Sequence, residues 1–141
     1  MGRTLEERIE VAHRHAAAEA SGDFEATMNT LDPEPVYEFQ PAGLLLRGRP
    51  AIRTYYQHFF ETFQPRIAGY QMRGEWVNEE GLGQEYWIEV RNDDGSVETH
   101  PVIGILLFGE RGLRGERLYA SDRMLRIMFG PAWELAEPMR R

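Results

Sequence analysis

The first part of the chain carries hydrophobic residues at helical spacing. A helix is predicted to begin after Thr4, because Thr4 and Glu7 form a capping box, and to end at Ser21-Gly22. A second helix is predicted to begin at Asp23 and to end at Asp32-Pro33-Glu34-Pro35. The apolar face of the first helix is expected to consist of Leu5, Ile9, Ala12, Ala16 and Ala20.

A short hairpin and a third helix follow. Residues 36–39 alternate between apolar and polar side chains, which predicts a short strand, and residues 44–46 are its expected hairpin partner. Gly48-Arg49-Pro50 opens the third helix, with proline near its first position. That helix is strongly apolar through Ile52 and a set of aromatic residues, Tyr55, Tyr56, Phe59, Phe60 and Phe63.

From residue 67 onward the pattern changes to that of strands. Strands are predicted over residues 67–78, 82–92, 97–108 and 113–121, and Asp94-Gly95 is a strong hairpin signal between the second and third of these. Helices followed by a long run of strands indicate the α+β class, and four long strands twist and curl. We therefore expect residues 1–141 to form one domain: a cone-shaped α+β barrel in which three N-terminal helices pack on a strongly curved, mainly antiparallel sheet around a buried apolar pocket.

Composition and charge narrow the classes of partner. The net charge of -7 argues against nucleic acid, which requires a clustered basic face. The absence of Cys excludes disulfides and thiol chemistry, and no apolar run is long enough to span a bilayer. His13 and His15 are expected to face different sides of their helix, so no metal site is predicted. We expect a soluble, cytoplasmic protein that binds a small hydrophobic molecule, without nucleic acid or membrane as a partner.

The order of these elements resembles the nuclear transport factor 2-like superfamily, and within it the SnoaL-like polyketide cyclases and the ketosteroid isomerase-like proteins. The stretches that carry the resemblance are residues 21–26, 36–41, 47–53, 115–119 and 125–130. The resemblance implies a homodimer, formed through the sheet, with one apolar pocket per subunit and no metal or organic cofactor. The superfamily contains cyclases, isomerases, dehydratases, epoxide hydrolases and non-catalytic members, so the fold alone does not fix the function.

Two residues are candidates for catalysis. His100, in Thr99-His100-Pro101, resembles the Thr-His of SnoaL-like cyclases, in which a His and an Asp share acid–base work. A two-residue loop at Asp94-Gly95 would pair Glu89 with His100, which favours a carboxylate–imidazole pair. The same register would place His100 opposite the apolar face of the sheet, in which case it is a structural or interfacial residue.

Asp122 is the second candidate, because the family has its catalytic Asp near this point. An ungapped count back from Gly130 places Ser121 at the family position and Asp122 one residue later. The alternative is that Asp122 caps the C-terminal helix. We expect at least one carboxylate among Asp122, Glu116 and Glu85 to lie in an apolar cavity with a raised pKa.

Aromatic residues are candidates for contact with a flat hydrophobic substrate, although each also fits simple core packing. The predicted substrate-binding residues are Tyr37, Phe39, Tyr56, Phe59, Trp76, Trp87 and Tyr119.

Three functions remain open from the sequence. The first is a cofactor-free enzyme of the cyclase or isomerase type that performs acid–base chemistry on a hydrophobic carbonyl compound. The second is a non-catalytic protein of the same fold that binds a small hydrophobic ligand or serves as a dimeric interaction module. The third is a dehydratase or an epoxide hydrolase; the latter requires an Asp-Arg-Asp arrangement for which the chain offers no convincing equivalent.

Overall fold

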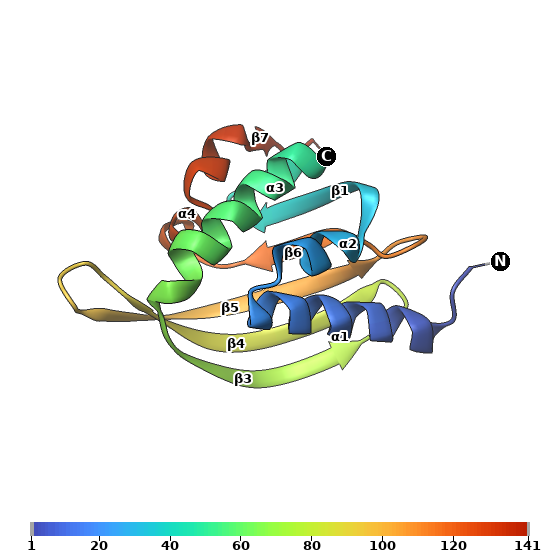
Figure 1. The fold of residues 1–141 in the computed structure, drawn as a ribbon, viewed down its shortest axis with the longest axis horizontal. Coiled ribbons are helices and arrows are strands. Elements are labelled where there is room, and N and C mark those ends of the chain that lie inside the picture. The colour runs from blue at the N-terminus through green and yellow to red at the C-terminus, as the bar shows by residue number, and fades with distance from the viewer. Residues whose placement is uncertain (1, 141) are drawn as a thin grey trace.

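The computed structural model describes residues 2–140 and shows the predicted α+β cone (Figure 1). Its helices are α1 (Leu5–Ser21), α2 (Phe24–Asn29), α3 (Arg49–His58) and α4 (Asp122–Phe129). Its strands are β1 (Leu31–Gln40), β2 (Leu44–Arg47), β3 (Ile67–Val77), β4 (Gly81–Arg91), β5 (Val97–Phe108), β6 (Leu113–Tyr119) and β7 (Glu137–Pro138).

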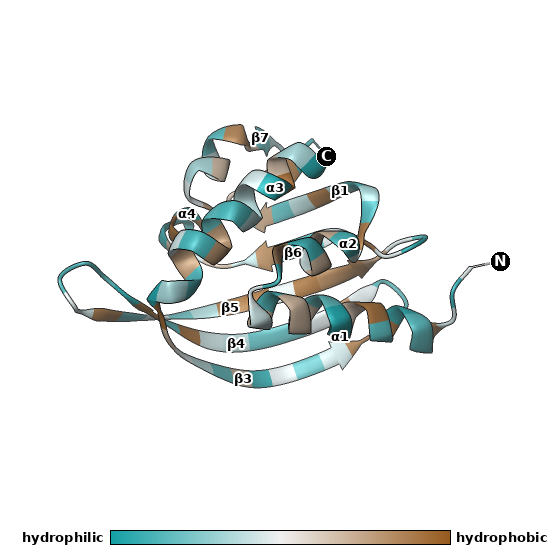
Figure 2. Ribbon diagram, in the orientation of Figure 1, coloured by the Kyte–Doolittle hydropathy of each residue, from teal (hydrophilic) through white to brown (hydrophobic). Residues whose placement is uncertain are grey.

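One curved sheet contains all seven strands in the order β3-β4-β5-β6-β1-β2-β7. Only the β1–β6 pair is parallel among the strand pairs that the structure describes. Helix α1 packs on β4 and β5, and α3 packs on β1 and β2, so the helices cover the inner face of the sheet (Figure 1). The turn between β4 and β5 projects from one end of the molecule and is hydrophilic (Figure 2). No helix in residues 2–140 is both long and apolar enough to cross a membrane.

The first helix follows the sequence prediction closely. Thr4 caps α1 and forms the capping box with Glu7, and Gly22 ends the helix in the left-handed conformation with φ 74°. Helix α3 begins after Gly48 as expected, and its last turns widen into a π-helical segment, Phe59–Phe63. Tyr55 of α3 stacks on the ring of Phe129 of α4, at 4.1 Å between ring centroids. This aromatic packing fixes α3 against α4.

The second helix is shorter than predicted and the first strand longer. Helix α2 ends at Asn29, and Leu31 and Asp32 already belong to β1. The carboxylate of Asp32 accepts hydrogen bonds from the backbone N–H groups of Glu110, Arg111 and Gly112 at 2.7–3.0 Å. The Asp-Pro sequence therefore holds the β5–β6 turn and does not mark the end of a helix.

Replacing Asp32 with Ala is expected to lower the free energy of unfolding by about 1–3 kcal/mol, because hydrogen bonds to a charged group are among the stronger ones. Urea titration followed by circular dichroism would measure the loss. Asp93→Ala, in the exposed β4–β5 turn, removes the same charge and is the matched control. A loss of equal size in both variants would contradict the role assigned to Asp32.

The register of β4 and β5 differs by one residue from the two-residue loop predicted at Asp94-Gly95. Arg91 pairs with Val97, so the connection spans residues 92–96, and His100 lies opposite Ile88 where the prediction paired it with Glu89. Asn92 closes this longer turn by donating its backbone N–H to the carbonyl of Ser96 at 2.8 Å. Since directly opposed residues share a face, the shift moves His100 to the inner face of the sheet.

The C-terminal region contains a helix before the one expected after Gly130. Ser121 caps α4 by accepting a hydrogen bond from the backbone N–H of Met124 at 3.1 Å, so Asp122 is the first helical residue and not the cap. The helix predicted after Gly130 is a 3-10 helix, Gly130–Leu135. Its Trp133 stacks on Phe39 at 5.5 Å between ring centroids, which closes the narrow end of the core.

Candidate functional site

A cavity of about 460 Å³ lies between α1, the end of α3 and the inner face of the sheet. Its lining is mostly aromatic and aliphatic, and its two charged members are Glu19 of α1 and Glu116 of β6. The other lining residues are Ala16, Ala20, Tyr55, Phe59, Phe63, Gln64, Ile67, Tyr70, Gln84, Tyr86, Ile88, Leu118 and Met128. An apolar cavity with a few convergent polar groups is the usual form of a small-molecule site.

Strand register explains why Glu116 points into this cavity. Glu116 lies opposite Leu106 and two residues before Leu118, and both neighbours are buried on the inner face. Its relative exposure is only 5%. The preceding Gly115 has φ 145°, and a Cβ there would overlap the backbone of Val36, so the close approach of β1 and β6 beside Glu116 requires glycine.

A network of polar side chains surrounds the Glu116 carboxylate. Nε2 of His15 lies 3.2 Å from Oε2 of Glu116 and 3.6 Å from Oε2 of Glu19. The Tyr56 hydroxyl lies 3.1 Å from the same Glu116 oxygen and 2.9 Å from that of Glu19. The Tyr37 hydroxyl lies 2.6 Å from the Tyr56 hydroxyl. The two carboxylates therefore share the protons of one imidazole and one phenol.

Hydrogen bonds and nearby charges together favour the imidazolium form of His15. The hydroxyl of Thr30 donates to the carbonyl of Thr27 at 2.7 Å, so it accepts from Nδ1 of His15, which lies 2.6 Å away. Nε2 faces the two carboxylates, which accept a hydrogen bond from it when it carries a proton. Burial acts to lower the pKa of His15, but the charge of Glu19 and the hydrogen bonds to Glu116 and Glu19 outweigh it and raise this pKa to about 10.

The pKa of the Glu116 carboxyl is raised above its ordinary value. Burial raises its pKa, and the nearby charge of Glu19 raises it further, while the hydrogen bond from His15 opposes both effects. We expected at least one of Asp122, Glu116 and Glu85 to lie in an apolar cavity with a raised pKa. Glu116 meets that expectation. A carboxylate with a raised pKa is a better general base at neutral pH than an ordinary one.

A phenolic hydroxyl is also available in the cavity. Tyr86 lines it, and within residues 2–140 its hydroxyl has no hydrogen-bond partner. Burial, followed by the charges of Glu19 and Glu116, raises the pKa of Tyr86, so the group stays protonated. Tyr86 can therefore donate a hydrogen bond to a ligand.

The structure places both predicted catalytic residues outside the cavity lining. Asp122 is exposed at the start of α4. His100 is on the inner face but near the open end of the sheet, where Nε2 lies 3.0 Å from Oε1 of Glu98. Arg123 of α4 donates to the same carboxylate, so this cluster joins α4 to β5. The structure does not bring His100 and Asp122 together with Glu116, and their catalytic roles stay predictions.

The seven predicted substrate-binding residues fall into four groups. Phe59 lines the cavity, while Tyr37 and Tyr56 lie behind its carboxylates and Phe39 packs in the core against Phe129 and Trp133. The remaining three lie on the outer face of the sheet. These are Trp76, opposite Gly83, Trp87, opposite Gln71 and Pro101, and Tyr119, opposite Ile103.

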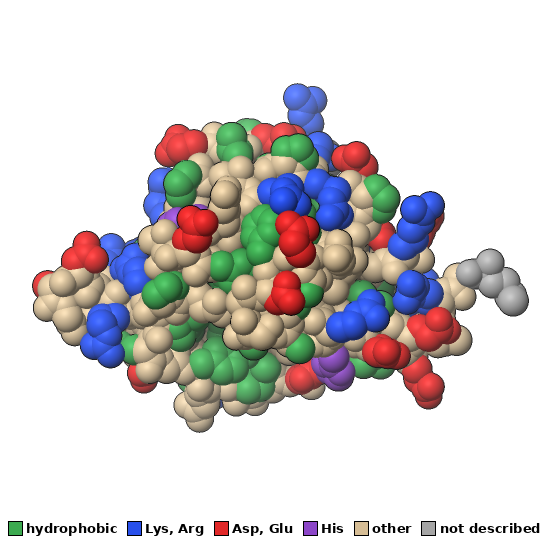
Figure 3. All heavy atoms as spheres, in the orientation of Figure 1, with side chains coloured by type: hydrophobic (Ala, Val, Ile, Leu, Met, Phe, Trp, Pro, Cys, Tyr) green, Lys and Arg blue, Asp and Glu red, His purple; other side chains and the backbone are tan. Residues whose placement is uncertain are grey.

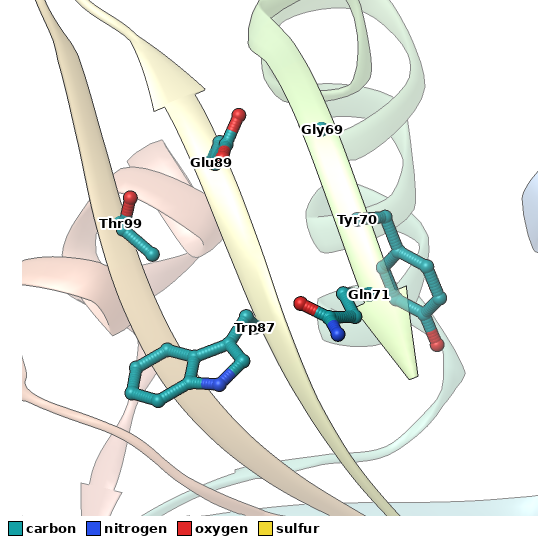
Figure 4. A pocket seen from close by; sticks show the side chains of 6 residues that line it. All are labelled: Gly69, Tyr70, Gln71, Trp87, Glu89 and Thr99. Atoms are coloured by element: carbon teal, nitrogen blue, oxygen red, sulfur yellow. The ribbon is translucent and has the colours of Figure 1, made fainter. Parts of the chain in front are cut away.

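A second hollow, of about 450 Å³, is open on that outer face (Figure 4). Figure 4 shows Trp87 and Glu89 of β4 beside Thr99 of β5 and Gln71 of β3. The guanidinium of Arg73 lies 5.3 Å from the Trp87 ring centroid. Within the described residues its lining has a single charged member, Glu89, and no cluster of titratable groups comparable to that around Glu116.

Sequence analysis missed His15 and Glu19. They are spaced i,i+4 on α1, which places them on one helix face, and His15 is fully buried. The signal was available, since a His–Glu pair interrupts a face otherwise formed by alanines. The expected separation of His13 from His15 is correct: His13 lies on the surface, 2.8 Å from Glu75.

Within residues 2–140, the side chains of His15, Glu19 and Glu116 form a group that could hold a metal cation. One ligand atom each from His15, Glu19 and Glu116 lies within 4.8 Å of the others. However, the Tyr56 hydroxyl lies within hydrogen-bond distance of all three, at 2.9–3.1 Å. The donors and acceptors of the group therefore satisfy one another as a proton-sharing network.

Comparison with known proteins supports the fold seen here. A structure of a nuclear transport factor 2-like protein of unknown function from Burkholderia xenovorans LB400 is 23% identical, with a TM-score of 0.62 over 84% of this chain and 86% of that one. A proposed SnoaL-like polyketide cyclase from Jannaschia sp. CCS1 is 13% identical, with a TM-score of 0.69 over 93% and 99%. A proposed isomerase from Bacillus subtilis is 16% identical, with a TM-score of 0.65 over 89% and 94%.

Sequence comparison gives the family more directly. Among curated protein sequences, none matches this chain. The model of the SnoaL-like domain matches residues 12–107, which include α1 from Ala12 onward, the aromatic helix and the sheet up to the end of β5. Because this match covers more than half of the sequence, the chain belongs to the SnoaL-like domain family.

Proposed function

We propose that this protein catalyses cofactor-free acid–base chemistry on a small hydrophobic carbonyl compound, with Glu116 as the general base. The observation that carries the proposal is the Glu116 carboxylate, buried in an apolar cavity and hydrogen-bonded to the His15 imidazolium. Membership of a family that includes polyketide cyclases and isomerase-like proteins supports the same class of reaction.

The proposed chemistry begins with removal of a proton from the carbon next to the carbonyl. Glu116 takes that proton, and the electron pair of the C–H bond moves to the carbonyl oxygen to form an enolate. Tyr86, whose hydroxyl is free to donate, stabilises the developing oxyanion. The proton is then returned to carbon, at the same or another position, which gives isomerisation, or the enolate attacks a second carbonyl, which gives cyclisation.

Deuterium exchange tests this proposal without knowledge of the natural substrate. The probe is 2-tetralone in buffered D2O, and proton NMR follows the loss of its α-hydrogen signals. We expect the wild-type protein to accelerate exchange well above the rate in buffer containing an equal concentration of acetate. The variants Asp122→Asn and His100→Gln are expected to retain that rate, because neither side chain lines the cavity. Exchange no faster than in acetate would contradict the proposal.

A non-catalytic binding role is the second candidate. One observation favours it: Ser121, at the position where the family resemblance places a catalytic Asp, is the cap of α4 and has no acid–base role there. A neutral fluorescent probe such as N-phenyl-1-naphthylamine would bind the cavity in either case. Binding of the probe without any acceleration of deuterium exchange would favour this second role.

We also propose that the outer face of the sheet forms a homodimer. This face carries Trp76 and Tyr119, which are 44% and 43% exposed, and the hollow around Trp87 is open on the same face. Sedimentation velocity is expected to give twice the mass of the chain, and Tyr119→Asp is expected to shift the protein toward monomer. Leu135→Asp, at a site 51% exposed outside the sheet, is the control. A wild-type monomer at micromolar concentration would overturn this proposal.

A further inference from the structure

We infer that the cavity around Glu116 selects ligands that carry an organic cation, a protonated or quaternary amine. The inference rests on the proposed function of this same cavity and names the class of molecule that it accepts. Two independent features point to it: the sign of the charges that line the cavity and the arrangement of its aromatic rings.

All charged side chains that line the cavity are acidic. Glu19 and Glu116 are its charged members, and no Arg or His is part of the described lining. This is a local property, since acidic and basic side chains are interspersed on the face of the molecule that Figure 3 shows. A neutral carbonyl compound would not require two carboxylates, whereas an ammonium group is stabilised by them.

His15 does not cancel both negative charges. It is fully buried behind the cavity, where Nδ1 is occupied by Thr30 and Nε2 by the carboxylates. One imidazolium faces two carboxylates, so the group retains a net negative charge when both acids are ionised. The side chain of Glu19 is 23% exposed, which leaves it accessible to a ligand in the cavity.

The negative potential of Glu19 and Glu116 extends to the aromatic rings around the cavity. The pKa of Tyr55 is raised first by burial and then by the charges of Glu19 and Glu116, and the same two charges contribute, after burial, to the raised pKa of Tyr86. A field that disfavours a phenolate favours a cation at the same place.

Two pairs of aromatic rings line the same cavity as the two carboxylates. Tyr55 and Phe59 of the aromatic helix pack edge to face at 5.7 Å, and Tyr70 and Tyr86 of neighbouring strands lie 5.0 Å apart between centroids. All four residues line the cavity. Ring faces attract ammonium groups, most strongly where water is excluded, and a cage of aromatic rings is the usual form of a quaternary ammonium site.

A pair of ligands of equal shape separates charge from hydrophobicity. Choline carries a trimethylammonium group, and 3,3-dimethylbutan-1-ol replaces its nitrogen with carbon. Isothermal titration calorimetry at pH 7 and low salt is expected to show choline binding at least about tenfold more tightly than the neutral alcohol. The cation is permanently charged, so the comparison does not depend on titration of the ligand.

Two variants that each lose one negative charge show whether the preference for choline arises in the cavity. Glu19→Gln removes a lining carboxylate and is expected to weaken choline binding about tenfold while leaving the neutral alcohol unchanged. Glu79→Gln removes the same charge from an exposed turn and is expected to leave both affinities unchanged. Circular dichroism confirms that each variant is folded.

The outcomes distinguish this inference from the proposed function. Equal binding of choline and the neutral alcohol overturns the selection for cations, and the proposed carbonyl chemistry is then still judged by deuterium exchange. An equal effect of Glu19→Gln and Glu79→Gln also overturns it, because the preference would then come from the overall charge. Absence of binding by either ligand, together with absence of deuterium exchange, overturns both proposals.

Discussion

Replacing Glu116 with Gln is expected to reduce the acceleration of 2-tetralone deuterium exchange by about 10²–10⁴-fold, which is the usual contribution of a positioned general base. The amide keeps the shape of the carboxyl and can still accept from His15 and Tyr56, but it cannot take a proton from carbon. Proton NMR at pH 7 measures the exchange rate directly, and circular dichroism checks that the variant remains folded.

The control for this result is Glu85→Gln. Glu85 lies on β4, which β5 separates from β6, and faces outward opposite Ile103, so Glu85→Gln removes the same charge without changing the cavity. Its exchange rate is expected to equal that of the wild type. If Glu116→Gln retained the wild-type rate, Glu116 would not be the base and the proposed mechanism would fail.

The protein is expected to lose several kcal/mol of folding free energy as pH rises from about 6.5 to about 10, because within this interval His15 holds its proton in the folded state and has lost it in the unfolded state. Its folded-state pKa is raised above the unfolded value, so the stabilisation is complete below pH 6.5. That stabilisation disappears as pH passes through the folded pKa of about 10. Urea unfolding at a series of pH values, followed by tryptophan fluorescence, would measure the decline.

Glu116 acts in the same direction. Its pKa is raised on folding, chiefly by burial, so its ionised form is less favourable in the native state and its contribution falls as pH rises above the ordinary carboxyl range. The variant His15→Gln retains an amide donor but has no titrating group. Its stability is expected to be lower at pH 7 and to fall less steeply than that of the wild type between pH 7 and about 10, where only the contribution of Glu116 remains. A wild-type profile that is flat over this interval would show that His15 is not charged in the native protein.

Most of the fold could be predicted from the sequence because its signals are local. Three correct predictions depend on residues that are close together in the chain. These are the capping box at Thr4, the pairing of β1 with β2, and the bounds of β5. The failures also have a local cause. Asp32 was interpreted as the end of a helix, but its partners are backbone groups 78–80 residues away, which no spacing reveals.

The candidate site was harder to predict because it depends on register. A turn of five residues in place of two moved His100 to the other face of the sheet, and the cap at Ser121 left Asp122 in solvent. Glu116 was among the candidates because it is a carboxylate in a strand. The sequence prediction considered His15 only as a metal ligand together with His13. Two partners of His15 in the structure, Thr30 and Glu116, lie on other segments of the chain, which the spacing of the two histidines does not reveal.

The distance in sequence between His15 and Glu116 has a consequence for how the protein matures. The two residues are separated by 101 positions, so during synthesis the first helix, which carries His15 and Glu19, emerges long before Glu116. Until β6 has been made, His15 lacks the hydrogen bond to Glu116 that contributes to its raised pKa, and Glu19 of the same helix is the acidic group beside it. Full stabilisation of the protonated His15 therefore requires completion of the sheet, and the ionisation state of the native cavity exists only once nearly the whole chain has assembled.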